Sequence, residues 1–393
     1  MASFVSSYVT ADPRRDGPTG DKLRFMPAGP SRRRFLQAAA STLPALAGEP
    51  KFAQTDVFRQ GEGGVHTYRI PALIETRRGD LLAVADARHE NANDLPNRIS
   101  LVLRRSHDQG RTWSAMRTLR AVDGGGVGDP SLLRDPRNER IWCFHAFGPP
   151  GIGTPTAKPG AVTGPETLQV HAMTSDDDGE TWSAPIDLTP QIKDPSWRAM
   201  FATSGTHFAT RRGRFLVPVA VFEGSGPSNV RNAYSDDGGR TWKIGPAIAP
   251  GTDESKCVEL ADGTVLENMR NGKTRAIARS HDGGVTFAVV THDDALIDAV
   301  CNAGLARYRH GGRDLLVFTN AAAATRRNLT VKFSSDGGGT WPQARVLHAG
   351  PAAYSTVLPL RDGTLAVLFE CGERSPYERI AFARFDPAWV LAG

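Results

Sequence analysis

Three arginines carry the clearest chemical signal in the chain. Arg69 lies in the tetrapeptide that begins at Tyr68, Arg270 ends a predicted hairpin, and Arg326 lies in the segment 325–331. A guanidinium group is planar and permanently charged, and its fork binds the two oxygens of a carboxylate in pairs. A cluster of these side chains would anchor an anionic ligand. Arg327 directly follows Arg326 and could take its place in such a cluster.

Tyr354, Glu254 and Asp94 could supply a nucleophile, a base and an acid. A free phenol, with a pKa of about 10, is a weak nucleophile, so Tyr354 needs a neighbouring base to accept its proton. Asp94 lies in the loop segment 93–97, where a carboxyl could protonate a leaving oxygen and later activate water, provided that the bound ligand and the closed loop raise its pKa. Glu259 competes with Glu254, and Asp86 competes with Asp94 although it lies inside a predicted strand.

A segment that is repeated five times indicates the kind of fold that positions these residues. The pattern Ser-x-Asp-x-Gly-x-Thr-(Trp/Phe), called the Asp box below, begins at Ser106, Ser175, Ser235, Ser280 and Ser334. Its Asp can accept bonds from the amides of a tight turn, its Gly can take a positive φ, and its aromatic residue can pack into a sheet beneath. Each box is therefore predicted to connect two strands.

The spacing of the boxes predicts a β-propeller. Intervals of 45 to 69 residues suit one four-stranded sheet per repeat. Short segments rich in β-branched and aromatic residues, such as 80–88, 99–106 and 379–385, read as strands, and hairpin turns are expected at Asp262-Gly263 and Asp362-Gly363. The expected fold is all-β: a six-bladed β-propeller of four-stranded antiparallel blades.

The charge of the chain and the spacing of its cysteines limit which ligands and partners it is expected to bind. Residues 1–47 hold seven Lys/Arg and three Asp, a surplus of four, which leaves +1 of the formal +5 for the remainder of the chain. That balance argues against nucleic acid as a partner. The four cysteines lie far apart without metal-ligand spacing, so they are expected to be free or buried.

The N-terminal segment is expected to be a leader. Residues 31–37, Ser-Arg-Arg-Arg-Phe-Leu-Gln, resemble a twin-arginine export signal, and the Ala-rich stretch that follows ends in a small-residue cleavage site at 45–47. The apolar run is too short for a membrane span. We therefore expect a leader at 1–47, a catalytic propeller at 48–393, and export to the periplasm or the cell exterior.

The segment Tyr68-Arg69-Ile70-Pro71 resembles the Arg-Ile-Pro signature near the start of the exo-α-sialidases (neuraminidases), whose propellers also bear repeated Asp boxes. The resemblance covers essentially all of residues 52–393. It implies retaining hydrolysis of terminal α-sialosides on sialylated glycans through a tyrosyl-enzyme intermediate, with no cofactor and no metal.

The resemblance also implies a role for each candidate residue. Arg69, Arg270 and Arg326 match the three arginines that bind the sialic acid carboxylate. Tyr354, thirteen residues after Trp341, matches the nucleophile. The other roles are Glu254 as the base that assists Tyr354, Asp94 as the general acid and then base, Arg88 as an additional ligand-facing arginine, Glu370 as the carboxylate that orients Arg69, and Asp129 as a residue that lines the pocket.

Three alternatives stay open at this point. A trans-sialidase would use the same residues, a related hydrolase would act on a deaminated sialic acid, and a non-catalytic propeller would only bind glycans. The last would be expected to lack the arginines, the tyrosine or the aspartate, and all of them are present. Linkage preference depends on loops at the pocket rim, where sequence reasoning is weakest.

Overall fold

The computed structural model describes residues 52–392, and their regular structure is almost entirely β-strand. The all-β class is confirmed. Helical structure in this part of the chain consists of the single turns α1 (Thr189–Ile192), α2 (Ala388–Leu391) and a 3₁₀ turn at Glu62–Gly64. None of the helices among these residues is long and apolar enough to cross a membrane. The predicted leader lies outside the described residues.

Four sheets follow one another along the chain. The first contains β2 (Thr67–Glu75), β3 (Leu81–Arg88), β4 (Ile99–Ser106) and β5 (Arg117–Arg120). The second contains β6 (Gly126–Arg134), β7 (Ile141–Gly148), β8 (Gln169–Ser175) and β9 (Ile186–Asp187), with β11 (Gly205–Thr206) added parallel to β6. The third contains β10 (Trp197–Ala202), β13 (Phe215–Glu223), β14 (Asn229–Ser235) and β15 (Lys243–Ile244), with β12 (Phe208–Ala209) paired to β13. The fourth contains β16 (Ser255–Glu259), β17 (Val265–Met269), β18 (Thr274–Ser280) and β19 (Thr291–Ile297).

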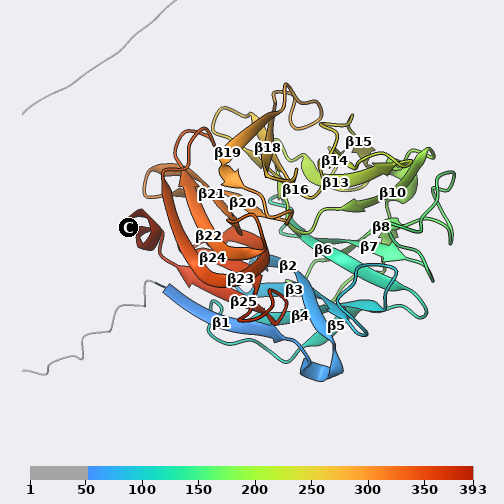
Figure 1. The fold of residues 1–393 in the computed structure, drawn as a ribbon, viewed down its shortest axis with the longest axis horizontal. Coiled ribbons are helices and arrows are strands. Elements are labelled where there is room, and N and C mark those ends of the chain that lie inside the picture. Colours follow the sequence, from blue (N-terminus) through green and yellow to red (C-terminus); the bar gives the residue numbers. More distant parts are fainter. Residues whose placement is uncertain (1–51, 393) are drawn as a thin grey trace, which may run out of the picture. The chain divides into compact units, whose positions relative to one another are not determined.

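The remaining strands form one sheet of seven rather than two sheets of four. Its members are β20 (Gly304–His310), β21 (Arg313–Ala321), β22 (Arg327–Ser334), β23 (Gln343–Pro359), β24 (Leu365–Cys371), β25 (Arg379–Phe385) and β1 (Phe52–Arg59). The two groups are joined because β23 is 17 residues long: its first part pairs with β22, and its second part pairs with β24. Figure 1 shows β1 beside β25, so both ends of the described chain meet in this sheet.

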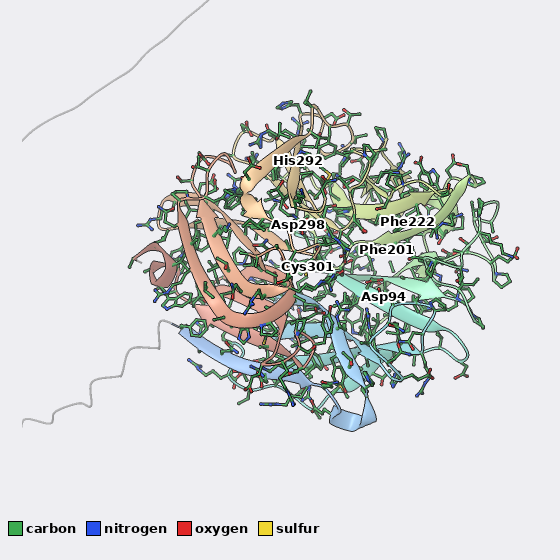
Figure 2. All side chains as sticks on the ribbon, viewed as in Figure 1. Asp94, Phe201, Phe222, His292, Asp298 and Cys301 are labelled. Carbon is green, nitrogen blue, oxygen red and sulfur yellow. The ribbon has the colours of Figure 1, made fainter. Side chains whose placement is uncertain are left out.

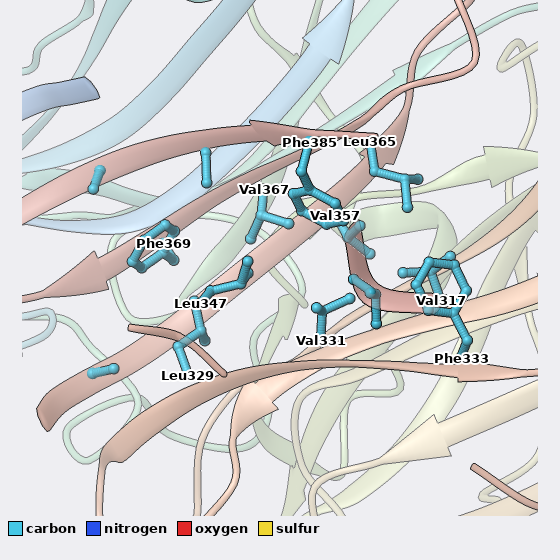
Figure 3. Packing of buried hydrophobic residues seen from close by; sticks show 14 of the residues in the cluster. Val317, Leu329, Val331, Phe333, Leu347, Val357, Leu365, Val367, Phe369 and Phe385 are labelled. Carbon is cyan, nitrogen blue, oxygen red and sulfur yellow. The ribbon is translucent and has the colours of Figure 1, made fainter. Parts of the chain in front are cut away.

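The seven-stranded sheet is held by a core to which both of its halves contribute. Val331 of β22, Val357 of β23 and Val367 of β24 belong to one cluster of buried side chains, together with Phe385 of β25 (Figure 3). Full burial of such a side chain contributes about 1.5–3 kcal/mol. Both faces of β24 are covered, because Val367 belongs to this cluster whereas its neighbours Ala366 and Leu368 belong to a second one.

Each Asp box follows the third strand of a four-stranded group, as predicted. In the box that begins at Ser175, the Ser175 hydroxyl donates to Asp177 Oδ1 at 2.8 Å and accepts from the Gly179 amide at 2.8 Å. The Thr181 amide donates to Asp177 Oδ1 at 2.9 Å. The other four boxes repeat the serine, glycine and threonine bonds. The boxes are hydrogen-bonded turns.

Replacing Asp177 by alanine should lower the free energy of unfolding without changing activity. The hydroxyl and the amide of Thr181, which donate to the carboxylate, lower the pKa of Asp177 to about 2. A carboxylate with a lowered pKa stabilises the fold above its ordinary pKa of about 4, and that contribution disappears as the pH falls through about 2. We expect a loss of about 1–2 kcal/mol at neutral pH in urea unfolding.

The matched control is Asp176→Ala, which removes an exposed carboxylate paired with Arg140 at 2.6 Å. An exposed ion pair contributes about 0–1 kcal/mol. Equal losses for the two variants at neutral pH, or a loss for Asp177→Ala that persists at the acid end, would contradict this account of the box.

Candidate active site

Tyr354 is the centre around which the predicted residues gather. Its hydroxyl donates to Glu254 Oε2 in a short hydrogen bond and accepts from Arg270 Nη1 at 3.2 Å. Arg270 Nη1 also donates to Glu254 Oε2 at 2.8 Å. Burial raises the pKa of Tyr354 well above its ordinary value, and the Glu254 carboxylate adds to this effect while Arg270 opposes it. The phenol is therefore protonated at neutral pH, with an acceptor for its proton already in contact.

The strand ends explain why Glu254 and Arg270 meet. Glu254 directly precedes β16 and Arg270 directly follows β17, and these strands are antiparallel neighbours. The backbone pairing continues past both ends, since the Arg270 amide donates to the Glu254 carbonyl at 3.0 Å. Tyr354 comes from β23 in a different sheet. The site therefore depends on how the sheets pack.

Arg69 of β2 lies beside the Tyr354 ring. Its guanidinium carbon is 5.1 Å from the centre of that ring, and its Nε donates to Glu370 Oε1 at 2.8 Å. Glu370 of β24 is fully buried and also accepts from the amides of Ile70, at 2.8 Å, and Tyr354, at 3.2 Å. One carboxylate thus fixes the first arginine and the backbone of the tyrosine together.

The backbone beside Arg69 is strained. Ile70 has a φ of 62°, which is a rare value for a β-branched residue, and the pairing of β2 with β3 shifts register between Arg69 and Ala72. Because Ile70 leaves the strand ladder, its amide is free to bond Glu370. Strain of this kind is concentrated at functional sites.

Arg326 is the third arginine of the cluster. Its guanidinium carbon is 5.4 Å from the centre of the Tyr354 ring, and its Nη1 donates to the Tyr377 hydroxyl at 2.7 Å. The guanidinium carbon of Arg69 lies 4.2 Å from the centre of the Tyr377 ring. The competitor Arg327 is exposed at the start of β22. The structure brings Arg326, rather than its neighbour, to Tyr354.

Asp94 lies in the loop between β3 and β4 with its side chain 78% exposed, and Figure 2 shows it toward the middle of the domain. Its Oδ1 is 2.7 Å from Arg88 Nη2. Partial desolvation by the surrounding protein acts to raise the pKa of Asp94, but Arg88, followed by Arg69 and Arg326, outweighs it and lowers the pKa below its ordinary value. The carboxyl is accordingly ionised when no anionic ligand is bound.

Arg88 contacts carboxylates on its own strand and on the loop that follows. It is buried, it contacts Asp86 Oδ2 at 3.1 Å as well as Asp94, and its Nη1 donates to the Ala92 carbonyl at 2.6 Å. Burial raises the pKa of Asp86 to about 7. The geometry makes Arg88 an anchor for the Asp94 loop.

Asp129 repeats the unusual backbone of Ile70. It has a φ of 55°, precedes a proline, and donates its amide to Asp86 Oδ1 at 3.0 Å. Burial raises the pKa of Asp129 well above its ordinary value, and Asp86 is the next largest cause. Glu259, the competitor of Glu254, accepts from the Arg211 amide at 2.8 Å instead of contacting Tyr354.

Sequence reasoning missed several members of the site. Tyr377 contacts Arg69 through its ring and Arg326 through its hydroxyl. It lies in a loop after a proline, where no sequence pattern predicts a functional residue. Ser204, Lys256 and Asn302 lie behind Glu254, and no motif in the sequence marks them. The four cysteines are buried and free, and no three His, Cys, Asp or Glu side chains within residues 52–392 are grouped to hold a metal ion.

Comparison with known proteins identifies the family. The BNR repeat-like domain family matches residues 126–367. A sialidase of Micromonospora viridifaciens is 37% identical over 90% of this chain and 57% of its own length, and a sialidase of Bacteroides fragilis is 34% identical over 79% of this chain and 61% of its own. The chain thus spans about three fifths of the length of these curated relatives. A solved Hadza microbial sialidase superposes with a TM-score of 0.80 at 32% identity, over 86% of this chain and 69% of that one. The chain therefore belongs to the BNR repeat-like domain family, among the bacterial sialidases.

Proposed function

We propose that the protein is a retaining exo-α-sialidase that releases terminal sialic acid from glycoconjugates. The observation that carries this proposal is the setting of Tyr354: its hydroxyl is bonded to a carboxylate and to one guanidinium group, and its ring lies beside two more guanidinium groups. The sialidases among its relatives support the same activity.

The arginine cluster suits a sugar whose anomeric carbon carries a carboxylate. Arg69, Arg270 and Arg326 bind that carboxylate through their planar forks. A carboxylate nucleophile would be repelled by the substrate's own carboxylate, whereas a neutral phenol is not. Tyr354 is therefore the group that attacks.

The reaction proceeds in two balanced steps. The Tyr354 oxygen forms a bond to the anomeric carbon while its proton passes to Glu254, and the glycosidic bond breaks as Asp94 protonates the departing oxygen. In the second step Asp94 takes a proton from water, the water oxygen bonds to the anomeric carbon, and the Tyr354 oxygen leaves and recovers the proton from Glu254. Two displacements at the same carbon retain its configuration.

The four-stranded groups fit the six blades of a propeller. Four groups are separate sheets, and the seven-stranded sheet supplies two more, divided within β23. The groups follow one another around the centre in chain order, and β1 completes the last of them beside β25 (Figure 1). Such an arrangement would bring the strand ends that carry Arg69, Arg270 and Tyr354 to one central pocket.

The leader and the domain boundary remain proposals as well. We infer that residues 1–47 direct export by the twin-arginine route and that 48–393 form the catalytic part. Cell fractionation, with Arg32 and Arg33 replaced by lysine, tests the route: the variant should stay in the cytoplasm.

The direct experiment is release of a fluorescent aglycone from an α-glycoside of N-acetylneuraminic acid by the full chain. Release at a catalytic rate is expected, and a folded protein that binds the glycoside without releasing the aglycone would overturn the proposal. Products from sialyllactose, with and without added lactose, separate free sialic acid from a transfer product. Parallel assays with a deaminated sialoside test the sugar preference.

The alkaline limb of activity should lie at a lower pH for kcat/KM than for kcat. Asp94 must be protonated to act as an acid, and three arginines hold its pKa below the ordinary value in the free enzyme. A bound substrate carboxylate neutralises Arg69 and Arg326, so the pKa of Asp94 rises in the complex. Since kcat/KM reports the free enzyme and kcat reports the complex, pH profiles with a natural sialoside separate the two limbs.

The control for this prediction is Asp94→Ala with an aryl glycoside, whose leaving group needs little protonation. The variant should keep more activity on the aryl glycoside than on the natural sialoside, and its alkaline limb should disappear. Coincident limbs in the wild-type enzyme, or an unchanged alkaline limb in Asp94→Ala, would assign the acid to another residue.

A further inference from the structure

The Glu254 carboxylate has a second set of contacts behind the site. Its Oε2 faces Tyr354 and Arg270, whereas its Oε1 accepts from the Ser204 hydroxyl at 3.4 Å. Ser204 is fully buried, and it lies in the connection between β10 and β11. One carboxylate oxygen of Glu254 therefore contacts the predicted nucleophile, and the other contacts the protein interior.

The contact continues to a buried cation. Asn302 Nδ2 donates to the Ser204 hydroxyl at 2.8 Å, and Lys256 Nζ donates to Asn302 Oδ1 at 3.0 Å. Each bond donates in the same direction, from the Lys256 ammonium toward the Glu254 carboxylate. Chains of this polarity strengthen one another in a low-dielectric interior. Lys256 lies two residues after Glu254, so both point to the same face of the extended chain.

The fold does not require the Lys256 ammonium as a hydrogen-bond donor. Both of its acceptors have another donor: the Ala303 amide donates to Asn302 Oδ1 at 3.0 Å, and the Thr203 hydroxyl donates to the Ser255 carbonyl at 2.9 Å. Burial lowers the pKa of Lys256 to about 8, and its side chain is almost completely buried. Protonated lysine at this position therefore costs folding free energy at and below neutral pH.

We propose that Lys256 is a positioning residue for the reaction, which acts through Asn302 and Ser204 to hold the charged Glu254 carboxylate against Tyr354. The inference rests on the proposed function. A buried charge that the fold does not need is explained if it favours the ionised base. The described hydrogen bonds of the Lys256 ammonium are to the Ser255 carbonyl and to Asn302 Oδ1, and neither is to Tyr354.

Other charged groups interact with Lys256 and Glu254, and they must be considered when the effect of replacing Lys256 is interpreted. Those that interact with Lys256 are Glu254, Arg275, Cys257, Glu267 and His207. Those that interact with Glu254 from the surrounding elements are Arg270, Tyr354, Asp253, Asp129, Arg275 and Cys301. Burial lowers the pKa of His207 to about 3, so this ring is neutral in the assay range. Replacement of Lys256 leaves all of these groups in place.

The test is Lys256→Met, which keeps the length of the side chain and removes its charge. We expect the acid limb of kcat/KM to move upward by about one pH unit, because a carboxylate that loses a cation binds a proton more readily. Below the limb this shift is a tenfold loss. The melting temperature should stay the same or rise, because an unfavourable buried charge is removed. A merely structural lysine would give a lower melting temperature and an unmoved limb.

The matched control is Lys193→Met, since Lys193 is also buried, has a pKa lowered by burial, and donates only to the Ala161 carbonyl at 2.6 Å among the described contacts. Its pH profile should match that of the wild type. Ser204→Ala, which interrupts the chain but leaves the ammonium, should move the acid limb in the same direction by a smaller amount, and it decides the matter if Lys256→Met does not fold.

The outcomes separate the two proposals. An inactive wild-type protein would overturn the proposed function. An active wild type whose acid limb is unmoved by Lys256→Met, or by Ser204→Ala where the first variant does not fold, would overturn the role of Lys256 alone.

Discussion

Tyr354→Phe should lower kcat on a synthetic sialoside by roughly 10³-fold or more, because it removes the oxygen that attacks the anomeric carbon. The hydroxyl is bonded to Glu254 and Arg270, while the ring lies beside Arg69 and Arg326. Phenylalanine keeps the ring and its contacts with the arginines. Substrate affinity should therefore change much less than kcat, as measured by steady-state kinetics with binding of a sialic acid analogue alongside.

Tyr308→Phe is the matched control for this prediction. Tyr308 is a buried tyrosine of β20 whose hydroxyl donates to the Gly363 carbonyl at 2.9 Å, away from the site. Its loss should cost about 1 kcal/mol of stability and leave kcat unchanged. A Tyr354→Phe protein with full activity would overturn the assignment of the nucleophile.

Glu370→Gln should damage both stability and substrate binding. Glu370 is fully buried and accepts from Arg69 Nε and from the amides of Ile70 and Tyr354. Glutamine removes the charge that balances the buried Arg69 and presents an NH₂ group where donors already converge. Loss of one partner from a buried ion pair costs about 3–5 kcal/mol. Because Arg69 and the Tyr354 backbone are released together, kcat/KM should fall by about 10²-fold or more.

The comparison for this variant is Glu267→Gln, at another fully buried carboxylate. Burial raises the pKa of Glu267 to about 7, and its Oε2 accepts from Asn232 Nδ2 at 3.1 Å, with no arginine partner. Its replacement should cost much less, as measured by urea unfolding and by kcat/KM. Equal costs for the two variants would show that buried glutamates in general, rather than the Arg69 pair, account for the loss.

Local sequence patterns were sufficient to predict the Asp boxes and two hairpin turns. The Asp boxes and the hairpin turns at Gly263 and Gly363 appear where the sequence predicts them, because tight turns depend on neighbouring residues and on the positive φ that glycine tolerates. The division of the strands into sheets was harder to predict from the sequence. The 17-residue β23 joins two groups into one sheet. Its partner changes beside Gly350-Pro351, a pair typical of turns, but the chain continues there as one strand.

The predicted site residues were selected by resemblance, and the structure adds how they contact one another. It brings Arg69, Arg270, Arg326 and Glu254 around Tyr354, from segments up to about 300 residues apart. Sequence alone could not reveal that Arg88 is occupied by Asp86 and Asp94, or that Tyr377 bridges two arginines. Such contacts depend on the packing of loops and sheets rather than on spacing along one chain segment.

The charged surroundings of Asp94 show the same limit of sequence reasoning. The sequence places this carboxyl in a loop, but the three cations around it come from β3, β2 and the segment before β22. They lower the pKa in the ligand-free protein. The raised pKa that acid catalysis needs is consequently expected only after the substrate carboxylate has neutralised part of this charge.

Mass spectrometry of the protein after reaction with a ring-fluorinated sialosyl fluoride would identify the nucleophile, because the glycosyl-enzyme intermediate breaks down slowly. We expect one added fluorosialosyl mass, located on the peptide that contains Tyr354 and absent from Tyr354→Phe. An adduct on a different residue, or continued turnover of the reagent by Tyr354→Phe at the wild-type rate, would contradict this expectation.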